Sequence, residues 1–238
     1  MQQLAPGAFR GGPGSYNYYA LVEDDEVTLI DAGCSRDWSR MTAGLESVGS
    51  SIDAVAGLIV THVHSDHFGA AVDASASGVD VSVHEDDEVR ALGDYEGRFG
   101  AEAGDLPIFS LRTWRNFLPM ILGGVMKLEF LDVVDTFSDG DALDLPGRPT
   151  VIHTPGHTEG HSMFHSGELL FTGDCLVTMD LLGSDRGPQY MQSVFDLDTE
   201  QSRASLDRIV DVDANLILPG HGEPWEGQPS RAVEIARG

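Results

Sequence analysis

The chain has 238 residues, and its 39 acidic side chains against 14 Lys and Arg give a net charge of −25 at pH 7. A chain of this length can bury a full core as one large domain, and so acidic a protein is a poor partner for nucleic acid. Two cysteines are too few for a disulfide framework. The most apolar segment, residues 118–126, is much shorter than the roughly 20 residues that span a bilayer. The first 15 residues lack the apolar run of a signal peptide, so we expect a cytoplasmic protein without a membrane segment.

The acidic composition with a single lysine, Lys127, is also typical of proteins from cells with molar intracellular salt. At 1 M salt the Debye length is only about 3 Å, so long-range effects of charge are largely screened. The alternative is an ordinary acidic protein. The dependence of folding and activity on potassium chloride distinguishes a halophilic protein from that alternative.

The first third of the chain alternates between patterns typical of strands and of helices. Short apolar or alternating runs predict strands at residues 16–22, 27–31, 56–60 and 79–83. Apolar residues at helical spacing predict helices at residues 36–48 and 67–77. Strand, helix and strand in succession favour an α/β layered fold.

Residues 85–140 are less regular, and we interpret them as a helical insertion. A short helix is expected at residues 86–92. Apolar residues at three- and four-residue spacing predict an amphipathic helix over residues 108–126, kinked or interrupted at Pro119 and ended near Gly123-Gly124. In one interpretation this helix packs on the core or forms a homodimer contact. In the other it is a lid that lines an apolar substrate pocket.

The remainder of the chain returns to short strands with two further helices. Strands are predicted at residues 142–145, 150–153, 162–165, 168–172 and 214–218, and helices at residues 199–210 and 229–236. No linker-like or low-complexity stretch divides the chain. We therefore predict a single domain over residues 1–238.

The heptapeptide Thr61-His62-Val63-His64-Ser65-Asp66-His67 directly follows the third predicted strand. In extended backbone His62 and His64 point to the same side, whereas a helix that begins near Asp66 turns Asp66 and His67 toward a neighbouring position. Imidazole and carboxylate ligands suit zinc, iron or manganese. Three histidines and an aspartate within six positions are unusual for ordinary core residues, so this stretch predicts a metal site.

Three downstream stretches share one form: an apolar strand, a glycine-containing turn and a residue that can bind metal. They place His157, Asp174 and His221 after their turns, and glycine permits the tight backbone turn at each strand end. Asp31, at the end of the second predicted strand, could orient a ligand or simply cap a turn. His161 is expected to support the site or the fold, and His84 to pack at a strand end.

Four motifs together resemble the metallo-β-lactamase superfamily and occur in its order: His62-Val63-His64-Ser65-Asp66-His67, Pro155-Gly156-His157-Thr158, Gly173-Asp174 and Pro219-Gly220-His221-Gly222. The resemblance covers the chain from about Tyr16 onward. It implies an α/β fold of four layers, an αββα sandwich in which two mixed β-sheets face each other with helices outside. It also implies that the ligands gather at one edge of the sheets.

The resemblance further implies two divalent metal ions, most simply Zn2+, with Fe or Mn as alternatives. Five histidines and two aspartates would form the ligand set: His62, His64 and His157 for the first ion, Asp66, His67 and His221 for the second, and Asp174 as the bridge. A metal-bridging hydroxide would then attack a substrate carbonyl or phosphoryl group. Asp66 and Asp174 are the predicted catalytic residues, with Asp66 as the proton acceptor.

Asp174 and His67 make the chain similar to the glyoxalase II, lactonase and ribonuclease Z branch rather than to the true β-lactamases. Only 17 residues follow His221, so we do not expect the glutathione-binding helical domain of glyoxalase II. We predict a hydrolase of a small-molecule ester, such as an acyl thioester, a lactone or a related ester. Tyr190 could donate a hydrogen bond to a developing oxyanion, with ordinary packing as the alternative.

Three alternatives stay open at the level of sequence. Relatives with similar loops bind one iron and oxidise persulfides, and iron accepts the same nitrogen and oxygen ligands. A phosphodiesterase similar to ribonuclease Z is disfavoured by the negative charge. A regulatory or assembly protein that merely retains its metals is disfavoured by the complete ligand set.

Overall fold

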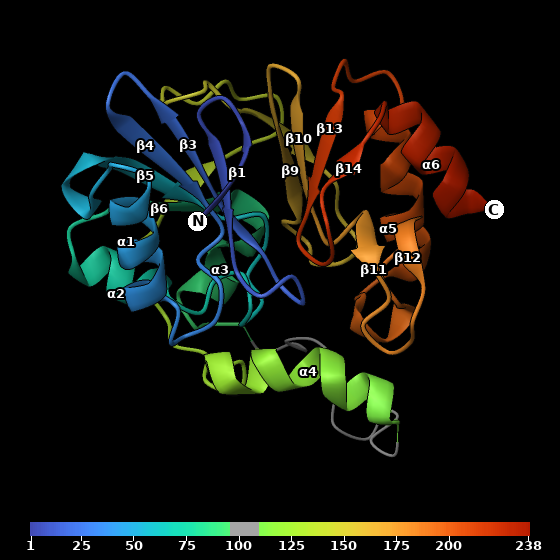
Figure 1. The fold of residues 1–238 in the computed structure, drawn as a ribbon. Helices are drawn as coiled ribbons and strands as arrows, with labels where there is room; N and C mark the ends of the chain where they lie inside the picture. Colours follow the sequence, from blue (N-terminus) through green and yellow to red (C-terminus); the bar gives the residue numbers. More distant parts are fainter. Residues whose placement is uncertain (96–109) are drawn as a thin grey trace.

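The computed structural model describes residues 1–95 and 110–238 and consists of two mixed β-sheets that face each other, with helices on their outer sides (Figure 1). The first sheet has the order β1 (Gln2–Ala5), β2 (Ala8–Gly11), β3 (Tyr18–Glu23), β4 (Glu26–Ile30), β5 (Val55–Ile59), β6 (Val81–His84) and β7 (Asp135–Phe137). The second has the order β14 (Trp225–Glu226), β13 (Leu216–Pro219), β10 (Leu169–Gly173), β9 (Ser162–Ser166) and β8 (Thr150–His153). A separate ribbon pairs β11 (Val177–Met179) with β12 (Arg186–Gln189).

The helices form the outer layers of the sandwich. They are α1 (Trp38–Ser47), α2 (Ala71–Ala76), α3 (Glu88–Ala91), α4 (Leu111–Gly123), α5 (Thr199–Ser205) and α6 (Pro229–Arg237). Short 3-10 turns occupy Ile52–Ala54, Glu85–Asp87, Ser193–Phe195 and Leu206–Ile209. Figure 1 shows α1 and α2 outside the first sheet, α5 and α6 outside the second, and α4 lying across one end of both. No helix within the described residues is long and apolar enough to cross a membrane.

Side chains that alternate along the strands form three buried layers. One lies between the first sheet and its helices, one between the two sheets, and one between the second sheet and its helices. In β4, Leu29 faces α1 and α2, whereas Ile30 faces the second sheet. In β10, Leu170 packs against α5 and α6, whereas Phe171 faces the first sheet. Successive residues of a strand point to opposite faces, so both faces of each sheet are covered. This confirms the predicted α/β fold of four layers with two mixed sheets.

Most predicted elements are present, with shifted ends. The predicted helix at 67–77 begins only at Ala71, because residues 66–70 form turns in which His64 O accepts the backbone N–H of Phe68. The strand predicted at 142–145 is wrong, since only an isolated bridge joins Ala142 to Thr150. The helix predicted at 108–126 is observed as α4, with its first two predicted positions outside the described residues. It runs without interruption through Pro119 and ends at Gly123, before the left-handed Gly124. The strands of the N-terminal hairpin, β1 and β2, were not predicted.

Candidate metal centre

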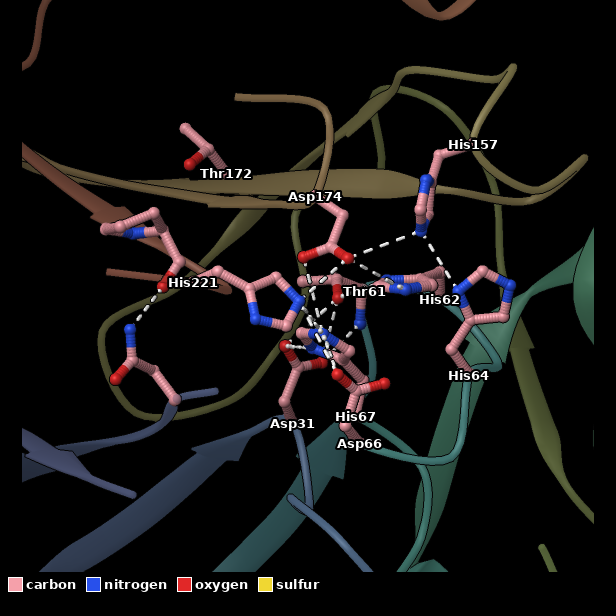
Figure 2. A network of polar contacts seen from close by, with 12 residues as sticks. Asp31, Thr61, His62, His64, Asp66, His67, His157, Thr172, Asp174 and His221 are labelled. Atoms are coloured by element: carbon pink, nitrogen blue, oxygen red, sulfur yellow. Dashed lines mark hydrogen bonds and ion pairs between the residues drawn. The ribbon is translucent and has the colours of Figure 1, made fainter. Parts of the chain in front are cut away.

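Parallel strand ends gather the candidate ligands at one edge of the sandwich. β4 and β5 are parallel neighbours, so Asp31 and the loop that carries His62 emerge side by side. In the facing sheet β10 and β13 are also parallel, and Asp174 and His221 follow their ends. His157 lies in the turn between β8 and β9. Rigid strands thus fix loops from both sheets around one point, which Figure 2 shows from close by.

The first group of candidate ligands comprises His62, His64 and His157, all at most 7% exposed. His157 Nε2 lies 3.0 Å from His64 Nδ1. The rings of His62 and His64 meet edge to face, with centroids 4.7 Å apart, as do those of His62 and His157 at 4.6 Å. Three ring nitrogens therefore converge within 4.8 Å of one another.

The second group comprises Asp66, His67 and His221, which are likewise buried. His67 Nε2 lies 3.5 Å from His221 Nε2 and 3.8 Å from Asp66 Oδ2. His221 Nε2 is 3.5 Å from Asp66 Oδ2. With metal–ligand bonds of about 2.0–2.2 Å, the edges of a tetrahedral site are roughly 3.3–3.6 Å long. The second group therefore has the dimensions of a metal site.

The carboxylate of Asp174 lies between the two groups (Figure 2). Its Oδ2 atom is 3.3 Å from His157 Nε2 and 3.0 Å from His221 Nε2. Its Oδ1 atom is 3.3 Å from His67 Nε2. One carboxylate therefore reaches nitrogen atoms of both groups, which is the arrangement that a bridging ligand requires.

Unpartnered atoms and shifted pKa values both indicate that a cation fits here. Buried His62 Nε2 and Asp174 Oδ1 have no hydrogen-bond partner within the described residues, although buried polar atoms are normally paired. Burial opposes charge on Asp174, yet His221 and His67 outweigh it and hold the pKa of this carboxyl well below its usual range. Burial, then His67 and His157, lowers the pKa of His62 well below its usual value, so its ring is neutral and available as a ligand.

Carboxylates outside the two groups hold the imidazole rings in place. Asp31 Oδ2 lies 2.8 Å from His67 Nδ1, and Asp196 Oδ1 lies 3.0 Å from His157 Nδ1. In each pair the remote nitrogen is engaged, so Nε2 is left for a metal, as is typical of metal-binding histidines. The predicted orienting role of Asp31 has this geometry. Asp196 was not predicted, because nothing in its neighbourhood of the sequence resembles a metal motif.

Asp87 is a second residue that the sequence did not reveal. Its fully buried carboxylate accepts hydrogen bonds from Val63 N at 3.0 Å, Thr158 Oγ1 at 2.8 Å and Gly160 N at 2.9 Å. Val63 lies between two candidate ligands, and Thr158 follows a third. Asp87 therefore joins the loop after β5 to the turn between β8 and β9, and its neighbour Arg90 lies 3.5 Å away at Nε.

His161 and the close approach of Gly220 fix the loop that carries Asp174. His161 Nε2 accepts the backbone N–H of Asp174 at 3.0 Å, and its Nδ1 lies 2.9 Å from Thr154 Oγ1. His161 is therefore a support and not a member of either group. Gly220 contacts Asp174 so closely that a Cβ atom there would collide with its Oδ1 atom and with the ring of His67. Only glycine fits at that approach.

A cavity of about 380 Å³ opens onto the two groups. Its floor includes His64, Asp66, His157, Asp174 and His221. Most of its wall is apolar and comes from α4, from residues 125–128 and from residues 181–195. Of the two interpretations of the predicted helix, this placement favours the one in which the helix lines an apolar pocket above the candidate ligands.

Tyr190 and the stacked pair His84 and His153 lie outside the metal centre. Tyr190 does not line the cavity; it packs against the cluster formed by β9, β10, β13, α5 and α6, with the Arg203 guanidinium 5.3 Å from its ring centroid. This placement favours ordinary packing of Tyr190 over the substrate contact that the sequence analysis also considered. His84 and His153 stack at 3.9 Å with planes only 13° apart. Their lone pairs lie in nearly parallel planes, so these rings are poorly placed to share one ion.

Comparisons with known proteins agree with this geometry. Residues 11–221 match the family model of the metallo-beta-lactamase superfamily. The probable metallo-hydrolase YqjP of Bacillus subtilis is 26% identical over 215 residues, which cover 86% of this chain and 66% of that protein. A peptide methionine sulfoxide reductase MsrA of Mycolicibacterium paratuberculosis is 34% identical over 95 residues, 37% of this chain and 54% of that protein. The chain thus spans between about half and two thirds of the length of these curated relatives.

A solved structure extends the agreement to three dimensions. The metallo-beta-lactamase family protein TTHA1429 from Thermus thermophilus has a TM-score of 0.68 and 26% identity, over 99% of this chain and 80% of that one. The match of the family model covers most of the chain and includes all seven candidate ligands. The chain belongs to the metallo-β-lactamase superfamily.

Proposed function

We propose that the chain is a dinuclear metal-dependent hydrolase of a small ester-type substrate: an acyl thioester, a lactone or a related ester. The observation that carries this proposal is the position of Asp174, whose carboxylate lies within 3.3 Å of nitrogens from both groups at the floor of a cavity. A carboxylate that reaches nitrogens of both groups can bridge two ions, which supports a dinuclear site. The partner that we propose is therefore a small molecule that enters this cavity.

The proposed ligand assignment follows the two groups. His62, His64 and His157 would hold one ion, Asp66, His67 and His221 the other, and Asp174 both. Five imidazoles with two carboxylates suit Zn2+ best, and Fe or Mn accept the same atoms. When bound, such a pair of ions lowers the pKa of coordinated water and polarises the substrate carbonyl.

The chain's own residues then perform the remaining tasks. Asp66 faces the cavity with a side chain 11% exposed, so its carboxylate is the proposed acceptor of the proton that water loses. The water oxygen forms the new bond to the acyl carbon, the acyl C–O or C–S bond breaks, and the proton ends on the leaving alcohol or thiol. α4 covers the floor and limits the access of bulk water.

A substrate panel with defined metal loading tests this proposal. The protein is stripped with a chelator, reloaded with zinc, iron or manganese, and assayed at low and molar potassium chloride on 4-nitrophenyl acetate, phenyl thioacetate, γ-valerolactone and, with oxygen present, a small-molecule persulfide. We expect hydrolysis that reaches its maximum at two equivalents of zinc per chain. Full loading without hydrolysis of any ester would contradict the proposal. Maximal activity with one equivalent of iron on a persulfide would replace it with the oxidative alternative.

A further inference from the structure

The wall of the cavity is almost entirely apolar. α4 contributes Trp114, Phe117, Met120 and Ile121, and residues 181–195 contribute Leu181, Met191 and Phe195. Ser65 and Thr113 are the uncharged polar residues of this lining within the described part of the chain. The charged and imidazole groups all lie at the floor, where the candidate metal ligands are. A ligand in this cavity therefore meets polar chemistry at one end and hydrocarbon at the other.

Thr113 and Asn116, the buried polar side chains of α4, are already engaged as hydrogen-bond donors. Asn116 Nδ2 donates to the carbonyl oxygens of Asp180 at 3.1 Å and Leu181 at 3.0 Å. Thr113 Oγ1 donates to Leu182 O at 3.2 Å. These bonds fasten α4 to the turn that follows β11. The apolar wall is thus a fixed part of the fold.

The aromatic rings of Phe117 and Phe195 stack beside each other in the lining of the cavity, with centroids 6.3 Å apart and planes 28° apart. No Lys or Arg lines the cavity among residues 1–95 and 110–238. Against this wall, away from the candidate metal ligands of the floor, a carboxylate or phosphate on the substrate would lose its hydration without gaining a counter-charge from the described residues, which is costly. An alkyl or aromatic group would instead lose only unfavourable contact with water.

We propose that the substrate is an ester whose acyl group is uncharged and apolar, and that α4 is the element that selects it. This inference rests on the proposed function and adds the chemical class of the acyl group. The carbonyl of the ester lies at the floor beside Asp174, and the hydrocarbon lies against the apolar wall that includes Phe117 and Phe195. A volume of about 380 Å³ is at the small end for ligand sites, so the acyl group is of medium length.

A series of straight-chain 4-nitrophenyl esters from acetate to decanoate tests the apolar wall on the zinc-loaded protein. Each buried methylene contributes about 0.8 kcal/mol, or roughly a fourfold rise in kcat/KM. We expect this rise from acetate until the cavity is full and then a plateau or fall. Hydrolysis of all chain lengths at one rate, above the rate without protein, would overturn the inference while leaving the hydrolase intact. Hydrolysis of none would instead count against the proposed function.

A pair of esters that are matched in length but differ in charge tests the absence of cations from the wall. We compare 4-nitrophenyl hexanoate with the 4-nitrophenyl half-ester of adipic acid, which has the same length but ends in a carboxylate. At molar potassium chloride, where the net charge of the protein is screened, we expect kcat/KM for the neutral ester to be at least 100-fold higher. Equal values, or a preference for the half-ester, would overturn the inference.

Variants of α4 test whether this helix determines the preference for an apolar acyl group. Phe117→Ala should lower the ratio of kcat/KM for octanoate to that for acetate at least tenfold. Ile121→Arg places a cation at the wall and should raise the half-ester relative to hexanoate at least tenfold. Leu118 lies outside the lining and is half exposed, so Leu118→Ala is the matched control with unchanged ratios. Unchanged ratios in Phe117→Ala and Ile121→Arg, with far-UV spectra like wild type, would place the selection elsewhere.

Discussion

The carboxylate of Asp87 accepts the backbone N–H of Val63 at 3.0 Å, although the two residues are 24 positions apart. Val63 separates two candidate ligands of the first group, and the same carboxylate accepts the hydroxyl of Thr158 next to the third. Neither Asp87 nor its partners touch a metal position. This buried contact nevertheless fixes how the three imidazoles approach one another.

Asp87→Asn should therefore weaken both the fold and the first metal position. An amide can accept at only one of its two atoms, so at least one of the three donors is left unpaired. We expect the free energy of unfolding to fall by about 2–3 kcal/mol, measured by urea denaturation of the metal-loaded protein. Asp80→Asn, at an exposed position, is the control. Equal stability of Asp87→Asn and wild type would show that the contact does not support the site.

Asp31 and Asp196 allow the two proposed metal positions to be weakened separately. Asp31 engages His67 of the second group, and Asp196 engages His157 of the first. Replacing such a carboxylate typically costs 10- to 100-fold in metal affinity. We expect Asp31→Asn and Asp196→Asn each to lower the affinity of one of two zinc equivalents, by titration against a chromophoric chelator. Asn suits position 31, where φ is 62°, because it tolerates left-handed backbone.

The double variant Asp31→Asn/Asp196→Asn is the control for this comparison. The double variant should lower the affinity of both equivalents. If either single variant lowers both equally, the two positions are not held by separate groups. If neither lowers any, the carboxylate–imidazole contacts do not orient the ligands.

Asp174→Ala should remove activity and lower metal content. The alanine leaves His157, His221 and His67 without the carboxylate that lies within 3.3 Å of each. We expect less than two zinc per chain by elemental analysis and a loss of hydrolysis of at least 100-fold. An active variant with two zinc ions would defeat the assignment of Asp174 as the bridge.

Acidification should destabilise the fold through His84, outside the metal centre. Burial, and then the neighbouring His153, lowers the pKa of His84 below its usual value near 6.5. The unfolded chain therefore binds more protons than the folded one between that lowered pKa and about 6.5, so stability is lost as the pH falls through this window. His84→Asn keeps an acceptor for the Asp86 N–H and should show a smaller loss between pH 7.5 and 5. Parallel losses in both proteins would contradict this origin.

The acidic composition gives a further prediction. A net charge of −25 makes the compact state repel itself, and salt screens that repulsion. We expect the urea midpoint to rise steadily from low to molar potassium chloride, with sucrose of equal osmolality as the control. A protein that is fully stable without salt would not be halophilic.

The sequence predicts the parts of this fold whose signal is local. β5 and the heptapeptide after it are adjacent in the chain, so an apolar strand followed by ligand residues is visible directly. β4, β10 and β13 have the same form. Predicting that His157, Asp174 and His221 converge on one site required the family resemblance. Spacing along a chain does not determine which strand ends meet.

Residues whose role depends on distant partners were not predicted. Asp87 and Asp196 are ordinary acidic residues in a chain that has 39, and only the folded arrangement separates them from the rest. Tyr190 shows the reverse case, since it follows the Asp174 loop in sequence but packs outside the cavity lining, as the packing alternative predicts. β1 and β2 lack a strong apolar pattern and depend on pairing with β3 for their conformation.

The central claim is that two metal ions share the carboxylate of Asp174. Anomalous diffraction from crystals of protein purified without added metal tests it most directly. We predict two peaks per chain about 3.5–4 Å apart, one among His62, His64 and His157, the other among Asp66, His67 and His221, and both within bonding distance of Asp174. A single peak, or two peaks of which only one contacts Asp174, would contradict the claim.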